Sequence, residues 1–116
     1  MHIQITTDNH IRGGEELTRD VESSVESTLG RFGDRITRVE VHLTDENGAK
    51  SGDDDKRCVM EARLNGLRPI TVTHRGATVD QAVSGAAHAL ERTIDSTLGR
   101  LHDHKGRTPY GGEPVN

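Results

Sequence analysis

Arginine is the residue type in this sequence that is best suited to binding an anion, and two arginines stand in a repeated motif. Twelve of the 15 basic residues are arginine. The planar arginine side chain matches a phosphate group, although it also serves in ordinary surface ion pairs. The motif Ser-Thr-Leu-Gly-Arg occurs twice, ending at Arg31 and at Arg100. Either both motifs end helices with a cation near the negative end of the helix dipole, or the two arginines form part of a phosphate-binding surface.

Residues suited to metal binding or nucleophilic chemistry give weaker patterns. Three adjacent aspartates at 53–55 lack the alternate-position spacing of a calcium loop. His102 and His104 point to different sides of a helix, so we prefer a solvated helix end to a metal site. Cys58 lies in a strand pattern, which favours a buried structural thiol over a nucleophile. No nucleophile or carboxylate pair has a helper at workable spacing, so we expect neither a cofactor nor enzymatic activity.

The composition indicates one domain with an aliphatic core. The chain has 116 residues, of which 2% are aromatic, enough for a two-layer core but not for two cores. It contains no apolar run of membrane-spanning length and no charged-then-apolar leader, so we expect a soluble, cytoplasmic protein.

Charge is unevenly distributed along the chain. Residues 1–55 hold six basic and 13 acidic residues, whereas residues 56–116 hold nine basic and six acidic residues. The net charge of −4 is unusual for an RNA-binding protein, because neutralisation of phosphates supplies most of the affinity. Local clustering of cations can overcome a negative total.

The longest predicted element is a helix over residues 78–104. Thr78 and Gln81 form a capping box, in which each side chain satisfies a free backbone N–H. A helix of this length with one apolar face needs a broad apolar partner. The stripe has the helical period and comprises Val79, Val83, Ala86, Ala87, Leu90, Ile94, Leu98 and Leu101.

The remaining elements complete a β-α-β-β-β-α order. Alternating segments predict strands at 2–6, 36–44 and 57–64, and a last strand begins at Ile70. A helix follows Glu15 and ends near Gly30 or Gly33. Residues 45–55 have the composition of a mobile hairpin loop. We expect an α+β domain over residues 1–105 and a flexible tail over 106–116.

The topology follows from the connections. A right-handed crossover makes the first two strands parallel, and tight turns make the last three an antiparallel meander. The result is a four-stranded mixed sheet with two roughly parallel helices on one face. The opposite face carries Gln4, Arg38, Glu40, His42, Glu61 and Arg63.

Parallel helices place their C-terminal ends at the same end of the molecule. The cations expected to gather there are Arg31, Arg35, Arg100, Lys105 and Arg107.

Three segments carry a resemblance to a known family. They are Met1-His2-Ile3-Gln4-Ile5, then Leu29 to Ile36 running into Val39-Glu40-Val41-His42-Leu43, and Val79 to Ala87 leading into Leu90-Glu91-Arg92. In order and spacing, over roughly residues 1–105, the chain resembles the ribosome hibernation-promoting factor family, also called the ribosome-associated inhibitor or sigma-54 modulation family.

The resemblance implies a fold similar to double-stranded-RNA-binding domains and binding to the small ribosomal subunit and its RNA where messenger and transfer RNA would lie. It implies inhibition of translation in idle ribosomes, without a cofactor or catalysis, and the chain looks like a short form of the family. Members usually carry several cations along the last helix, of which Arg92 remains here. The RNA-binding residues that we expect are Arg31, Arg35, Arg92, Arg100, Lys105 and Arg107.

The alternative is a protein-binding module of the same fold that has lost RNA binding. Such a module would act through its open sheet face or as a dimer paired by edge strands. Salt distinguishes the two functions, because binding to RNA weakens steeply as salt is added whereas an apolar or edge-strand interface does not.

Overall fold

The predicted order of elements is confirmed. The computed structural model describes residues 1–8, 11, 13–46 and 55–106, of which 102–106 are described by their backbone alone. The elements are β1 (His2–Thr7), α1 (Gly14–Leu29), the 3-10 helix η1 (Gly30–Arg35), β2 (Ile36–Asp45), β3 (Lys56–Leu64), β4 (Ile70–Gly76) and α2 (Val79–Gly106).

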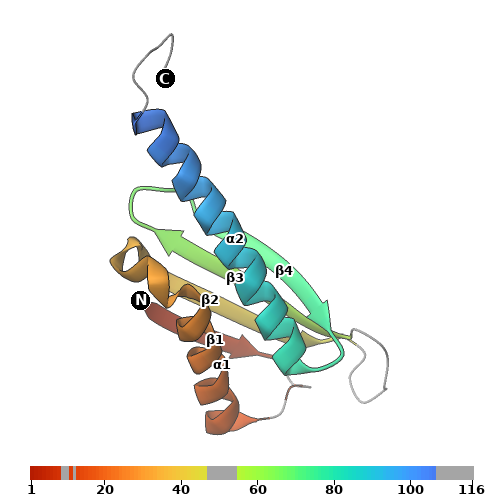
Figure 1. The fold of residues 1–116 in the computed structure, drawn as a ribbon. Helices are drawn as coiled ribbons and strands as arrows, with labels where there is room; N and C mark the ends of the chain where they lie inside the picture. Colours follow the sequence, from red (N-terminus) through yellow and green to blue (C-terminus); the bar gives the residue numbers. More distant parts are fainter. Residues whose placement is uncertain (9–10, 12, 47–54, 107–116) are drawn as a thin grey trace.

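The four strands form one mixed sheet in the order β1-β2-β3-β4. β1 is parallel to β2, with Ile3 opposite Val39, and the other two pairs are antiparallel, with Met60 opposite both Val41 and Val72. Both helices cover the same face (Figure 1). The predicted parallel crossover, meander and one-sided helices are therefore confirmed.

The core lies between α2 and the inner face of the sheet. Ala86, Ala87, Leu90 and Ile94 are fully buried, and the two small alanines let α2 approach the strands closely. α2 continues beyond the end of the sheet (Figure 1). The predicted apolar stripe is confirmed, and its last residues are only half-buried because little of the sheet lies beneath them.

The predicted capping box begins α2, with one difference. The Gln81 N–H donates to Thr78 Oγ1 at 3.1 Å, as expected. The Gln81 side-chain oxygen accepts from the N–H of Ala77 at 3.0 Å, rather than from Thr78 itself. Two free donors at the helix N-terminus are satisfied in this way.

The prediction of a loop over residues 45–55 is wrong at its first residue. Asp45 is the last residue of β2, and Asp55 precedes β3 directly. Both are buried, since Lys56 Nζ lies 2.8 Å from Asp55 Oδ1 and 3.5 Å from Asp45 Oδ2. This pairing lets two carboxylates leave water. Residues 47–54, including Asp53 and Asp54, lie outside the described residues.

The two Ser-Thr-Leu-Gly-Arg motifs do not both end helices. The first ends α1 at Leu29, and η1 then contains Gly33 in a left-handed conformation with φ of 58°. The second lies inside α2, which runs through Gly99 to Gly106. The predicted tail over 106–116 begins with the last residue of α2, and its other residues lie outside the described part. Among the described residues, no helix is long and apolar enough to cross a membrane.

Candidate nucleic-acid interface

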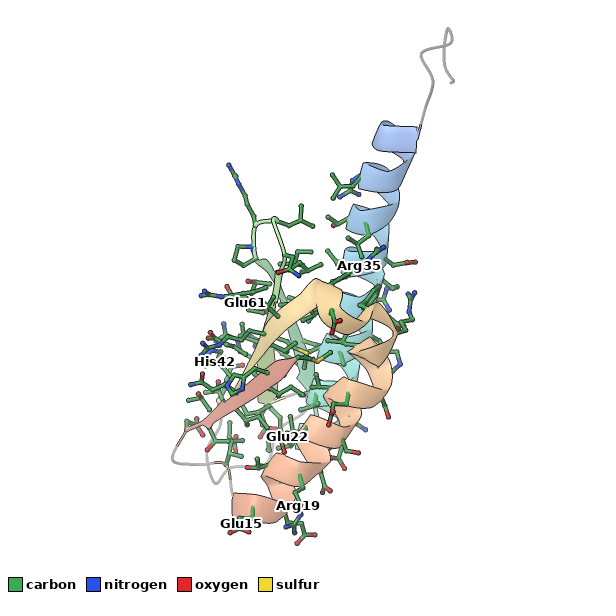
Figure 2. All side chains as sticks on the ribbon, turned by 90° about the vertical axis from the view of Figure 1, so that its left-hand side faces the viewer. Glu15, Arg19, Glu22, Arg35, His42 and Glu61 are labelled. Atoms are coloured by element: carbon green, nitrogen blue, oxygen red, sulfur yellow. The ribbon has the colours of Figure 1, made fainter. Side chains whose placement is uncertain are left out.

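A cleft of about 540 Å³ lies where η1 meets the C-terminal part of α2. Figure 2 shows Arg35 on this side of the molecule, beside α2. The cleft is more polar than apolar, and two of the predicted RNA-binding residues contribute to it. It is lined by Arg31, Phe32, Arg35, Asp95, Leu98 and Gly99.

Neighbouring elements fix η1 in this position. Phe32 is buried in the core and anchors the middle of the short helix. The turn after β3 holds its end, because the Asn65 N–H donates to the carbonyl of Arg35 at 3.0 Å. The Asn65 side-chain amide donates to the carbonyl of Asp34 at 3.1 Å. The backbone that carries Arg31 and Arg35 is therefore tied to both the core and the sheet.

Arg31 forms an ion-paired bridge between η1 and α2. Its Nε lies 3.0 Å from Glu91 Oε2, and a terminal nitrogen lies 3.5 Å from Asp95 Oδ1. The guanidinium also stacks over the ring of Phe32, 4.4 Å from its centroid. The hydrogen bond to Glu91, aided by the charge of Asp95, raises the pKa of Arg31. Two carboxylates thus compensate its positive charge.

Three other predicted arginines retain uncompensated charge. Arg35, Arg92 and Arg100 are exposed, and none has an ion pair with another residue of the described part of the chain. The Arg100 side chain donates to Ser96 Oγ on its own helix, at 3.1 Å. We call Arg31, Arg35, Arg92 and Arg100 the basic pole.

The structure brings the predicted residues together only in part. Arg31 and Arg35 line one cleft, whereas Arg92 and Arg100 lie on α2 outside its lining. Lys105 lies in the last turn of α2, but its side chain is not among those described, and Arg107 is outside the described residues.

Sequence reasoning missed the acidic partners of Arg31. Glu91 and Asp95 are four residues apart, so they lie on one side of α2. That spacing was available in the sequence. Their contact with Arg31 depends on how α1 and α2 pack, which the spacing alone does not determine.

The open sheet face also carries arginines, but most of them are ion-paired. Figure 2 shows His42 and Glu61 on the side of the sheet away from the helices. The ion pairs are Arg38 with Glu40 at 3.1 Å, Arg63 with Glu61 at 3.6 Å and Arg75 with Glu46 at 2.7 Å. Because each pair joins side chains of opposite sign, most of the positive charge of the arginines on this face is compensated. Arg57 is the arginine of this face without such a pair among the described residues.

Burial limits Cys58 as a nucleophile, and the placement of the possible ligands limits metal binding. Cys58 is fully buried, as predicted, and burial raises the pKa of its thiol to about 12. No three histidine, cysteine, aspartate or glutamate residues in the described segments are placed to hold a metal ion.

Comparison with known proteins gives a family and a fold. The sequence model of the family described as sigma 54 modulation protein / S30EA ribosomal protein matches residues 3–102. No sequence among curated proteins matches the chain.

Among solved structures, the N-terminal domain of Protein Y from Thermus thermophilus is similar, with a TM-score of 0.66 and 17% identity. The alignment covers 84% of this chain and 99% of that one. A ribosomal subunit interface protein from Coxiella burnetii has a TM-score of 0.63 and 18% identity, with 85% and 99% covered. At these identities the structures establish a shared fold.

Proposed function

Because the chain belongs to the sigma-54 modulation protein / S30EA ribosomal protein family, we propose that it is a ribosome-associated factor. It binds RNA of the small subunit near the decoding region and inhibits translation in idle ribosomes. The observation that carries this proposal is the set of exposed arginines without an ion pair among the described residues: Arg35 in the cleft, Arg92 at the middle of α2 and Arg100 in its C-terminal part. The name of the Coxiella burnetii structure, a ribosomal subunit interface protein, supports the same location.

The basic pole suits contacts with the phosphate backbone. Arginine binds phosphate oxygens with paired N–H groups, and such contacts position a protein on RNA without reading its sequence. Only 2% of the residues are aromatic, so stacking of bases on aromatic side chains contributes little. Recognition therefore rests on the shape and charge of folded RNA.

Arg31 has a conditional role in this proposal. Its ion pairs with Glu91 and Asp95 must compete with any phosphate that enters the cleft. Arg35, which lines the same cleft without an ion pair in the described structure, is the better primary contact. Lys105 and Arg107 extend the proposed contact set along the chain. The activity is binding, with no catalysis, cofactor or membrane involved, and we place it in the cytoplasm.

The second candidate is a protein-binding module of the same fold, acting through its open sheet face or as an edge-paired dimer. The compensated charge of Arg31 and the net charge of −4 favour it. It differs from the first candidate in its response to salt.

Sedimentation with purified ribosomal subunits tests the proposal. We expect the protein to co-sediment with small subunits rather than large ones. The logarithm of the association constant should fall linearly with the logarithm of salt concentration, by roughly 0.7–0.9 for each phosphate neutralised. Addition of the protein should also lower the yield of a cell-free translation reaction. Binding to large subunits alone, or binding that does not respond to salt, would contradict the proposal.

A further inference from the structure

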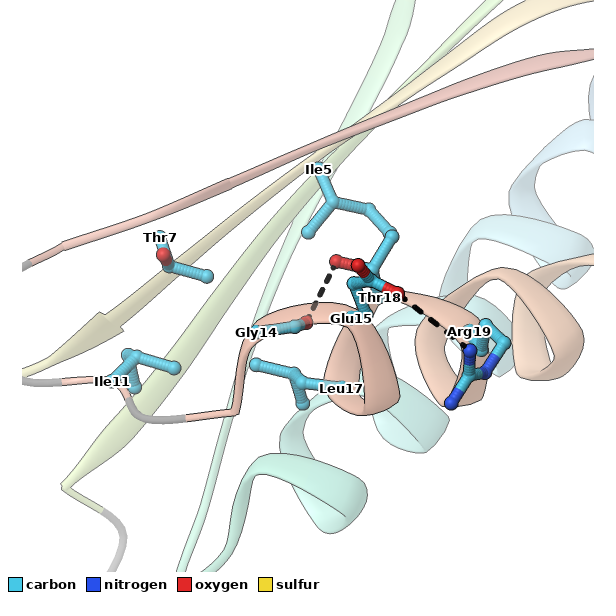
Figure 3. A pocket seen from close by; sticks show the side chains of 8 residues that line it. All are labelled: Ile5, Thr7, Ile11, Gly14, Glu15, Leu17, Thr18 and Arg19. Atoms are coloured by element: carbon cyan, nitrogen blue, oxygen red, sulfur yellow. Dashed lines mark hydrogen bonds and ion pairs between the residues drawn. The ribbon is translucent and has the colours of Figure 1, made fainter.

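An apolar hollow of about 460 Å³ lies between β1 and the first turns of α1 (Figure 3). None of its lining residues belongs to the basic pole. In Figure 3 the side chain of Ile5 points from β1 towards α1, and Leu17 and Ile11 lie below it. The hollow is more apolar than polar. The residues that line it on its two sides include Ile5, Thr7, Ile11, Leu17 and Thr18.

The hollow exists because α1 does not cover the outermost strand. α1 packs mainly against α2 and contacts β1 only lightly. Ile5 and Leu17 are consequently half-buried, although both face the core side of the sheet. β1 pairs with β2 along one edge. Its other edge has no strand partner in the described part of the structure, so alternate N–H and C=O groups there are free to bind another strand.

A second, acidic hollow of about 200 Å³ adjoins the first. The two hollows share Leu17 as a common wall, and the second is lined also by Gly13, Glu16 and Asp20. Glu16 and Asp20 are exposed and have no ion pair among the described residues, whereas neighbouring Glu15 lies 4.0 Å from Arg19. α1 as a whole carries five acidic residues and one basic residue. Figure 2 shows Glu15, Arg19 and Glu22 along α1.

We propose that this surface binds an extended, basic segment of a partner protein. The segment adds to the free edge of β1 by backbone hydrogen bonds and places an apolar side chain in the hollow beside Ile5 and Leu17. A lysine or arginine of the segment lies beside Glu16 and Asp20. Main-chain pairing gives such a strand addition its affinity, and the pockets for alternate side chains give it specificity. The site is separate from the basic pole and does not depend on RNA binding.

Charge favours a basic segment of another protein as the occupant of this surface, over RNA and over a second copy of the chain. An RNA phosphate backbone would be repelled by the carboxylates of α1. A second copy of the chain that paired through its own β1 would bring no lysine or arginine, since β1 has the sequence His-Ile-Gln-Ile-Thr-Thr. The opposite edge strand, β4, carries Arg75, but Glu46 already pairs with it at 2.7 Å. The cations of the basic pole lie on helices, which cannot extend a sheet. A basic strand from another protein can form backbone hydrogen bonds with the open edge of β1 and ion pairs with the carboxylates of α1.

Fluorescence anisotropy with a short synthetic peptide tests the site. The probe alternates lysine and valine and carries fluorescein, and it is titrated with the full chain. We expect saturable binding that weakens with salt. Glu16→Gln combined with Asp20→Asn should weaken binding about three- to tenfold, as expected for two exposed ion pairs. The matched control, Glu26→Gln with Asp34→Asn, removes the same charge from residues that do not line either hollow and should leave binding within about twofold.

Two further probes separate strand addition from simple charge attraction. A peptide of the same composition with its lysines and valines in separate blocks should bind at least fivefold more weakly, as should one with alternate backbone amides methylated. Amide NMR shifts on binding should be confined to β1 and the first half of α1. Equal binding of all three peptides, shifts centred on the open sheet face, absence of saturable binding, or self-association through β1 in sedimentation equilibrium would each overturn the proposal.

Discussion

The guanidinium of Arg31 on η1 lies 3.0 Å from the carboxylate of Glu91 on α2, joining the two helices at the end of the molecule where the predicted RNA contacts gather. Asp95, one turn along α2, lies 3.5 Å from the same guanidinium. The arginine that the repeated sequence motif singles out therefore has acidic partners. The affinity of the basic pole for an anion depends on whether these carboxylates remain in place.

Removing the two carboxylates should strengthen binding to RNA. In Glu91→Gln combined with Asp95→Asn, Arg31 would be free to bind a phosphate. We expect tighter association with small subunits and a salt dependence steeper by about one phosphate contact. The control, Asp20→Asn with Glu26→Gln, removes the same two charges from α1. Equal affinities for the two variants in co-sedimentation would mean that Arg31 contributes nothing to binding.

The centre of the α2 stripe should dominate stability. Leu90 is fully buried, so Leu90→Ala should lower the free energy of unfolding by about 2–5 kcal/mol through lost burial and a cavity. Ser96 is exposed on the same helix, and its hydroxyl oxygen accepts a hydrogen bond from Arg100. Ser96→Ala should change the urea midpoint little. Similar midpoints for the two variants would show that the assigned helix face is wrong.

Replacing each of two glycines by alanine, one just before α2 and one near its C-terminal end, should change the stability of the fold in opposite directions. A Cβ at Gly76 would lie 2.8 Å from both the Ala82 nitrogen and Gln81 Cβ, so Gly76→Ala should cost about 1–3 kcal/mol. A Cβ at Gly99 would meet nothing within 4 Å. Because alanine favours the helical conformation more than glycine does, Gly99→Ala should raise the free energy of unfolding by about 0.5–1 kcal/mol. A destabilised Gly99→Ala variant in urea unfolding would argue that α2 does not continue through this residue.

Burial of Cys58 makes stability fall at high pH. The pKa of its thiol is about 12 in the folded protein, against an ordinary value of 9.0. The folded state therefore holds the proton more tightly, so the stabilisation is complete below pH 9 and is lost as the pH rises towards 12. The slope for one proton is about 1.4 kcal/mol per pH unit.

Comparison with Cys58→Ala isolates the contribution of the thiol. A hydrogen bond to Asp55 raises the pKa of Lys56, which adds loss of stability above its ordinary value of 10.5 in both proteins. The variant should be less stable at neutral pH, and its deficit should shrink between pH 9 and 12. A deficit that stays constant over this range in urea unfolding would contradict the burial argument.

The fold could be predicted because each element carries its own signal. Ile3 and Ile5, Val39 and Val41, and the stripe through Leu90 each mark one buried face, and a two-layer arrangement is the simple way to bury them all. The extension of β2 to Asp45 was not predictable, because an aspartate at the end of a strand becomes buried only when Lys56 lies beside it.

The candidate site was predictable only in outline. The direction of the helices placed Arg31 and Arg35 at one end, and the structure puts them in one cleft. The partners of Arg31 depend on the rotation of α2 about its axis relative to η1. The second copy of the motif lies inside α2, as the helix predicted over residues 78–104 requires, so the alternative in which both motifs end helices is wrong.

The central claim is that arginines of the basic pole contact small-subunit RNA, and its most direct test is the salt dependence of co-sedimentation for Arg92→Glu with Arg100→Glu. Neither side chain lies on the apolar stripe, so circular dichroism should show an intact fold. The control, Arg19→Glu with Arg75→Glu, makes the same change of charge on α1 and β4. We expect the pole variant to bind small subunits more weakly than the control, with a salt slope shallower by about one for each lost contact. A pole variant that co-sediments with the wild-type affinity and salt slope would contradict the claim.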